Sequence, residues 1–238
     1  MLLKLLAISS ITLAFQGDEH NDETVLFYYG LEESERGLPW CGASQVCSAL
    51  LPRYWRPRAL LRLCRCARRQ RCDTVAPQQR LLELNNRAHL QFCKPVSEIA
   101  ECAYNDTALI VDTHQERMNP DEIEMMHHNN VHLAPPKIIL NCRCRLPNYW
   151  KLKSHENTMF SYQCSSLPLC KTGDFCGHVD NDFFALYQSC LCPKRHICVH
   201  DGGVPHTIIS ELMYRGRGWK AHCRMSTYNS SDQDYDYS

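Results

Sequence analysis

The chain lacks the short sequence signatures that identify common enzymes. No G-x-S-x-G elbow, H-E-x-x-H motif, P-loop or G-x-G-x-x-G turn occurs in its 238 residues. It also lacks net charge, because 26 basic and 26 acidic side chains balance, so no overall field favours nucleic acid or an anionic membrane. We therefore expect no enzyme activity, no cofactor and no nucleic-acid partner.

A segment that could span a membrane is missing as well. Residues 1–16 carry a single early lysine, Lys4, and then an apolar run that ends at Phe15. This run is far shorter than the ~20 residues that cross a bilayer, and it is typical of a secretory signal peptide. No later stretch is apolar enough to span. The sequence therefore predicts a secreted, extracellular protein, in a compartment where disulfides persist.

Cysteine is abundant instead, with sixteen residues, and its spacing is repeated. The first half reads C-x5-C-x16-C-x-C-x5-C-x20-C and the second reads C-x5-C-x19-C-x-C-x5-C-x24-C. The two sets are Cys41, Cys47, Cys64, Cys66, Cys72 and Cys93, and Cys164, Cys170, Cys190, Cys192, Cys198 and Cys223. Cys176 is an additional member of the second set, and the cysteines between the sets are Cys102, Cys142 and Cys144. The repeat predicts a disulfide framework built twice, in which the first two cysteines of each set take equivalent partners.

Metal binding is the competing use of so many cysteines. The C-x-C pairs lack the C-x2-C spacing of common zinc sites, and an oxidising compartment disfavours free thiolates. We therefore expect eight disulfides. In an extended strand residues i and i+2 share a face, so each C-x-C pair directs both sulfurs to one side, toward two different partners. These pairs are predicted to mark central strands.

The patterns together predict a small, disulfide-rich, mainly β fold made of two related cysteine modules with a short helical insertion. The predicted segments are a signal peptide at 1–16, an acidic segment at 17–36, a first module at 37–150 with an insertion at 103–140, a second module at 160–226 and a disordered acidic tail at 227–238. Within the insertion, Asn119-Pro120-Asp121-Glu122 is typical of a helix start. Glu124, His128 and His132 could bind a metal from one side of this helix, although an exposed polar face explains them equally well.

Charge is arranged in blocks along the chain. Residues 17–36 are acidic and end in Glu33-Ser34-Glu35-Arg36, which resembles the processing sites of toxin precursors and makes this segment a possible propeptide. The alternative is that Val25 to Tyr29 forms an apolar strand and remains in the protein. Between Arg53 and Arg71 there are eight arginines and no acidic residue. Two sequons, at Asn105 and Asn229, are possible glycosylation sites.

Three phrases of the sequence, NCRCRLPNYW, SYQCSSLPLCKTGDFCGHVDND and SCLCPKRHIC, resemble two groups of secreted proteins. One is scoloptoxin family eleven, the cysteine-rich proteins of centipede venom. The other is the giant-lens (Argos) group of growth-factor antagonists, whose clamp-like modules hold an EGF-type ligand. The resemblance runs from about Cys41 to Cys223. The motif C-x-C-P-x4-C is intact at Cys190–Cys198, whereas the first module lacks the proline.

These resemblances imply two functions, both with an extracellular protein as the partner. The first is a toxin-like protein that binds and modulates an ion channel or a receptor, and the arginine block favours it because guanidinium groups pair with carboxylates at channel mouths. Its predicted contacts are Arg62, Arg65, Arg68 and Arg69. The alternative is a secreted antagonist that sequesters an EGF-like growth factor between its modules. The arginine block makes the toxin-like function the favoured one.

Overall fold

The computed structural model describes residues 24–29, 34–53, 56–67, 70–74, 77–84, 87–113, 120–145, 148–212 and 214–226. The predicted signal peptide and acidic tail, and the greater part of the acidic segment, lie outside these residues. The described chain is mainly β, as predicted, with one short α-helix. It contains no helix that is long and apolar enough to cross a membrane.

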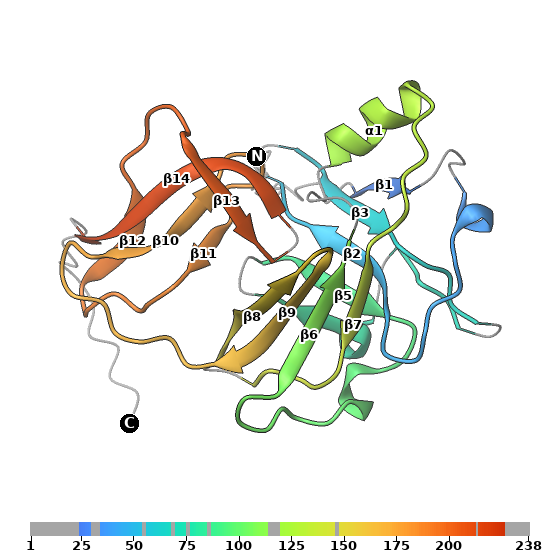
Figure 1. Ribbon diagram of the computed structural model, residues 1–238, viewed down its shortest axis with the longest axis horizontal. Helices are drawn as coiled ribbons and strands as arrows, with labels where there is room; N and C mark the ends of the chain where they lie inside the picture. The colour runs from blue at the N-terminus through green and yellow to red at the C-terminus, as the bar shows by residue number, and fades with distance from the viewer. Residues whose placement is uncertain are drawn as a thin grey trace, which may run out of the picture.

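The strands form three sheets, which we call the first, middle and third modules (Figure 1). The first contains β1 (Thr24–Tyr28), β2 (Val46–Leu51), β3 (Arg58–Arg62), β4 (Leu81–Glu83) and β5 (His89–Phe92). The middle module contains β6 (Thr107–Asp112), β7 (Lys137–Leu140), β8 (Tyr149–Glu156) and β9 (Met159–Ser165). The third contains β10 (Phe175–Asp180), β11 (Leu186–Gln188), β12 (His196–His200), β13 (Thr207–Glu211) and β14 (Tyr214–Met225).

The three sheets share one strand order, which corrects the prediction of two modules. The orders are β3-β2-β5-β4, β7-β6-β9-β8 and β11-β10-β14-β12, with β1 added at the edge of the first sheet and β13 paired to β14. In each of these sets of four, the strand that comes first in the chain is hydrogen-bonded between the strand that comes second and the strand that comes last. The predicted insertion at 103–140 supplies β6 and β7, so it belongs to a module of its own. Sequence spacing missed this module because it carries fewer cysteines than the others.

All sixteen cysteines are joined in eight disulfides, and none is free. The first module has Cys41–Cys64, Cys47–Cys72 and Cys66–Cys93, the middle module has Cys102–Cys142 and Cys144–Cys164, and the third has Cys170–Cys190, Cys176–Cys198 and Cys192–Cys223. The first and third modules thus share a pattern in which the first cysteine pairs with the third, the second with the fifth and the fourth with the sixth. The predicted alignment was wrong by one position, because Cys164 closes the middle module and Cys176 is the second cysteine of the third.

The C-x-C pairs lie just beyond the ends of strands, rather than in central strands as predicted. In the first module the residue between the two cysteines, Arg65, forms an isolated parallel bridge with Trp40. Its N–H donates to the Pro39 carbonyl and its carbonyl accepts from the Cys41 N–H, both at 2.9 Å. Equivalent parallel bridges join Arg143 to Glu101 and Leu191 to Leu169. Each module is therefore closed by the same short crossing of two chain segments, pinned by its first disulfide.

The middle module has no second-to-fifth disulfide, and Ala108 and Trp150 take the two positions. Ala108 follows Cys102 by six positions, and Trp150 follows Cys144 by six positions. In the other two modules the same separations join the first cysteine to the second and the fourth to the fifth. The Ala108 carbonyl accepts from the N–H groups of Asn141 and Cys142. In the first module the Cys47 carbonyl accepts from the two equivalent N–H groups. Trp150 lies opposite the last cysteine of its module in the β8–β9 ladder, as Cys198 does in the third. Both side chains are buried, so a small residue and a large aromatic fill the space of a bridge.

A single buried cluster joins the three modules. It contains Leu61 of the first, Leu109 of the middle and Tyr214 of the third. The buried Tyr162 hydroxyl donates to the Leu212 carbonyl at 2.7 Å and so links the middle module to the third. Because the modules share this core, their outer surfaces are held in fixed relative positions.

The helix α1 (Pro120–His128) forms where the sequence predicts one, with proline at its first position. Ile123 is buried and Met126 packs against the core. The helix lies beside β1 (Figure 1). β1 itself pairs in parallel with β3, and the following Tyr29 is 2% exposed. Residues Thr24–Tyr28 of the acidic segment are thus built into the first sheet.

Candidate binding surface

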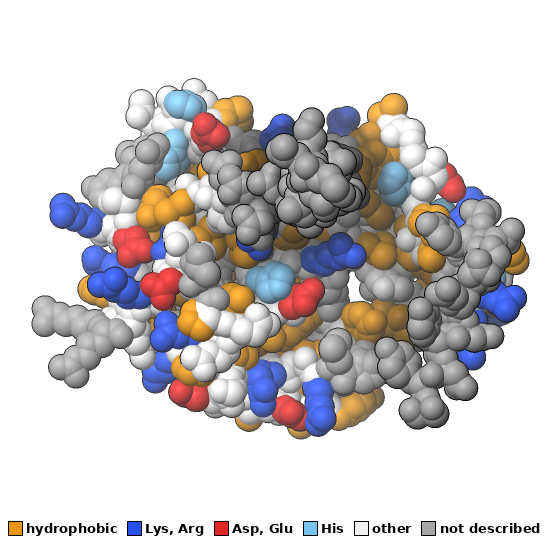
Figure 2. All heavy atoms as spheres, turned by 180° about the vertical axis from the view of Figure 1, so that it is seen from behind, with side chains coloured by type: hydrophobic (Ala, Val, Ile, Leu, Met, Phe, Trp, Pro, Cys, Tyr) orange, Lys and Arg blue, Asp and Glu red, His pale blue; other side chains and the backbone are white. Residues whose placement is uncertain are grey.

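The first module is strongly basic, although the chain as a whole has no net charge. Residues 34–99 contain twelve lysines and arginines against four aspartates and glutamates, and eleven of the twelve are arginine. Figure 2 shows Lys and Arg side chains along its left edge, where this module lies. Because the whole chain is neutral, this surplus of basic residues means that the rest of the chain is acidic overall. The molecule therefore has a positively charged side rather than a uniform surface.

An exposed tryptophan and an arginine form the centre of this surface. The Arg65 guanidinium carbon lies 4.0 Å from the centre of the Trp40 ring, within the range of a cation–π contact. The parallel bridge between these residues places them side by side, and the adjacent Cys41–Cys64 disulfide fixes the crossing. Trp40 remains 59% exposed. Its exposed indole surface is open to contact by a partner.

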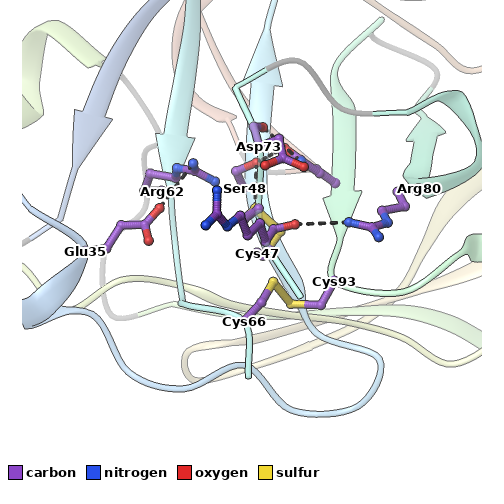
Figure 3. Close-up of polar contacts among 11 residues, drawn as sticks. Glu35, Cys47, Ser48, Arg62, Cys66, Asp73, Arg80 and Cys93 are labelled. Atoms are coloured by element: carbon purple, nitrogen blue, oxygen red, sulfur yellow. Dashed lines mark hydrogen bonds and ion pairs between the residues drawn. A yellow bond between two sulfur atoms is a disulfide. The ribbon is translucent and has the colours of Figure 1, made fainter. Parts of the chain in front are cut away.

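A pocket of about 450 Å³ opens beside Trp40. Its lining residues are Trp40, Cys66, Ala67, Gln70, Arg71, Asp73 and Arg80. Arg80 Nη1 donates to the Arg71 carbonyl at 3.1 Å, which fixes the direction of that side chain (Figure 3). The buried Nε atoms of Arg65 and Arg80 have no hydrogen-bond acceptor among the described residues. The pocket therefore combines an aromatic surface with cationic groups.

A buried polar network holds the pocket loop against the sheet. Ser48 Oγ donates to Gln91 Oε1 at 2.6 Å, and Gln91 Nε2 donates to the Asp73 carbonyl at 2.9 Å. The Cys47–Cys72 disulfide also joins β2 to the segment that contains Asp73 (Figure 3). Buried polar groups that are fully paired rigidify a site. The pocket is thus preformed.

Arg62, one of the predicted contact residues, is buried rather than displayed. Its side chain lies between Glu35 and Ser48 (Figure 3) and is 4% exposed as a whole residue. Arg62 Nη2 is 3.1 Å from Glu35 Oε1, while Nε and Nη1 have no acceptor among the described residues. Ser48 lies opposite Arg62 on β2, and Cys72 Sγ is 3.4 Å from the Ser48 Oγ. Of the other predicted arginines, Arg65 contacts Trp40, and Arg68 and Arg69 lie outside the described residues.

The remaining predicted sites are dispersed. Asn105 is exposed in a turn before β6, with a φ of 65° and its carbonyl bound by Lys153 Nζ at 2.8 Å; Asn229 lies outside the described residues. Within the described chain, the sets of three ligand atoms that are close enough for a metal are all cysteines, and these are already bonded in disulfides. Glu124 and His128 of α1, and His132 beyond its end, do not form such a set.

The third module presents an aromatic surface that the sequence analysis missed. Phe184 and His200 stack on Trp219, with ring centres 5.7 and 4.6 Å away. Trp219 Nε1 donates to the Gly203 carbonyl at 2.9 Å. Phe184 is 45% exposed and has a φ of 54°, a conformation that is strained for a bulky side chain. The Phe183-Phe184 pair after β10 was the available signal, because two large aromatics in a turn are unusual.

Asp180 holds the turn that carries Phe184. Asp180 Oδ1 accepts from the N–H groups of Asp182 and Phe183, and the Asp180 N–H donates to the Ala185 carbonyl at 3.2 Å. Burial raises the pKa of the Asp180 carboxyl from 3.8 to about 6. A buried carboxylate thus organises the turn that displays an exposed aromatic.

Comparison with known proteins identifies the fold. No family model matches the chain, and no curated protein matches it. Among solved structures, the crystal structure of unliganded Argos matches with a TM-score of 0.51 and 19% sequence identity. The match covers 85% of this chain and 99% of that chain. At this identity the likeness establishes the Argos fold, and the resemblance to scoloptoxin family eleven gains no support from it.

Proposed function

We propose that this protein is a secreted binding protein that sequesters a small, EGF-like growth factor. The observation that carries the proposal is the Argos fold, which this chain reproduces over 99% of that structure. The resemblance to the giant-lens group of ligand antagonists, noted on the cysteine phrases, points the same way. The eight disulfides agree with an extracellular setting. Of the two predicted functions, the antagonist is the better supported.

The architecture suits the capture of a folded ligand. Three modules share one core, so their outer surfaces form a rigid frame that loses little conformational entropy on binding. A standard protein interface buries ~1,200–2,000 Å², with aromatic anchors at its centre. Phe184 and Val204, which are 45% and 79% exposed, supply anchors of this kind on the third module. The toxin-like function stays a prediction, and the burial of Arg62 removes one of its expected contacts.

Binding of isolated EGF-like domains to the immobilised, fully oxidised protein tests the proposal. We expect a one-to-one complex whose affinity changes little between low and high salt, because apolar burial is not screened. Phe184→Ala should weaken it by about 30-fold or more, as expected for a hot-spot aromatic. Leu152→Ala, a comparably exposed apolar residue of the middle module, is the matched control. Absence of binding to every EGF-like domain tested would refute the proposal.

A further inference from the structure

The pocket beside Trp40 lies on the strongly basic first module, and the ligand-sequestering function does not account for it. Eleven arginines in residues 34–99 are far more than the fold requires, since the other two modules form the same sheet without them. Arginine rather than lysine is the residue that binds tetrahedral oxyanions through paired N–H donors. The composition of this module therefore points to a multiply charged anion.

We infer that this pocket binds a sulfated polysaccharide chain of the extracellular matrix. Arg71 and Arg80 line the pocket and supply guanidinium groups for sulfate esters. Trp40 supplies an exposed indole edge and face against which a sugar ring can pack, held in place by Arg65.

Two features favour a saccharide over an acidic peptide. The pocket lining includes the carboxylate residue Asp73 and the amide residue Gln70, whose side chains can exchange hydrogen bonds with sugar hydroxyls, groups that the side chains of an acidic peptide lack. In the sequence, the basic residues of the module also extend beyond those that line the pocket, to Arg53, Arg56 and Arg58, which suits a long polyanion. An extended, regularly sulfated chain meets both conditions.

Such a site would act together with the proposed growth-factor capture. The aromatic surface around Phe184 belongs to the third module, whereas Trp40 and Arg80 belong to the first. A polysaccharide bound at the first module therefore leaves that aromatic surface free. It would hold the protein at the cell surface or matrix, where the growth factor is released.

Salt elution from immobilised heparin tests the inference directly. We expect the full-length protein to elute above physiological salt, and Arg71→Ala with Arg80→Ala to weaken binding of a heparin oligosaccharide by about tenfold. Lys171→Ala with Lys194→Ala, two exposed cations of the third module, is the control and should leave elution unchanged. Trp40→Ala should lower oligosaccharide affinity although it removes no charge. Each variant is first shown to contain eight disulfides by intact mass.

Four results would overturn the inference. They are failure of the parent protein to bind heparin, equal losses in the pocket variant and the control, full binding by Trp40→Ala, and displacement by polyaspartate as effective as displacement by heparin. The last result would make an acidic peptide the partner. Desulfated heparin serves as the probe for sulfate and should fail to compete. Growth-factor binding by the pocket variant should be unchanged, which separates this inference from the proposed function.

Discussion

The missing disulfide of the middle module can be restored by design. If Ala108 and Trp150 occupy the second and fifth cysteine positions, then Ala108→Cys combined with Trp150→Cys should form a ninth bridge. The shortest path between the two positions runs through the Cys102–Cys142 disulfide and spans roughly 15 residues, for which chain entropy gives about 3 kcal/mol of stabilisation. Loss of a buried tryptophan costs about 3–5 kcal/mol.

The two contributions nearly cancel, so the double variant should be less stable than the parent by only ~0–2 kcal/mol. Trp150→Ala alone should lower the free energy of unfolding by about 3–5 kcal/mol, since nothing replaces the packing. Intact mass before and after reduction, with urea denaturation, measures both effects. Reduction should add eighteen hydrogens to the double variant rather than the sixteen expected from the natural cysteines. Two alkylatable thiols in the folded variant would refute the positional equivalence of the three modules.

Three further predictions follow from single side chains. Glu35→Gln removes the charge beside the buried Arg62, so it should lower the free energy of unfolding by about 1–2 kcal/mol in urea denaturation, whereas Glu83→Gln should be neutral; equal effects would contradict the pairing. Burial raises the pKa of Asp180 above its unfolded value, so its contribution to stability is complete below about pH 4 and is lost as pH rises through about 6. The free energy of unfolding should fall by up to ~3 kcal/mol across this window, and Asp180→Asn, which keeps the acceptor, should flatten the profile; an unchanged profile would show that Asp180 is not the titrating group. Asn105 is exposed in its turn, so protein secreted from eukaryotic cells should lose mass on deglycosylation, and Asn105→Gln should abolish the part of that loss that belongs to this site; an unmodified Asn105 in peptide mapping would contradict it.

The cysteine pattern was enough to predict the mainly β class, because sixteen cysteines at repeated spacings leave few other folds. It was not enough to find the middle module. Ala108 and Trp150 replace two of the six cysteines there, so the spacing that marks the other modules is absent. Because these two cysteines are missing, the sequence spacing placed Cys164 in the third module, whereas it closes the middle one. The folded backbone shows the equivalence, through the bonds to the Ala108 carbonyl and through the register that places Trp150 opposite Cys164.

The surface was harder to predict than the fold. The arginine block is plain in the sequence, but the folded sheet buries Arg62 next to Glu35, while a crossing of two distant segments brings Trp40 to Arg65. Phe184 owes its exposure to a turn held by Asp180. These outcomes depend on contacts between residues far apart in the chain, and spacing alone does not reveal them.

The central claim is that the protein acts by holding a soluble growth factor. It is tested most directly by measuring EGF-receptor phosphorylation in cells exposed to a fixed concentration of growth factor and increasing concentrations of this protein. The account predicts inhibition that is complete near one equivalent of protein per growth factor and is fully reversed by added growth factor. Inhibition that ignores the growth-factor concentration, or no inhibition by protein with all eight disulfides formed, would contradict it.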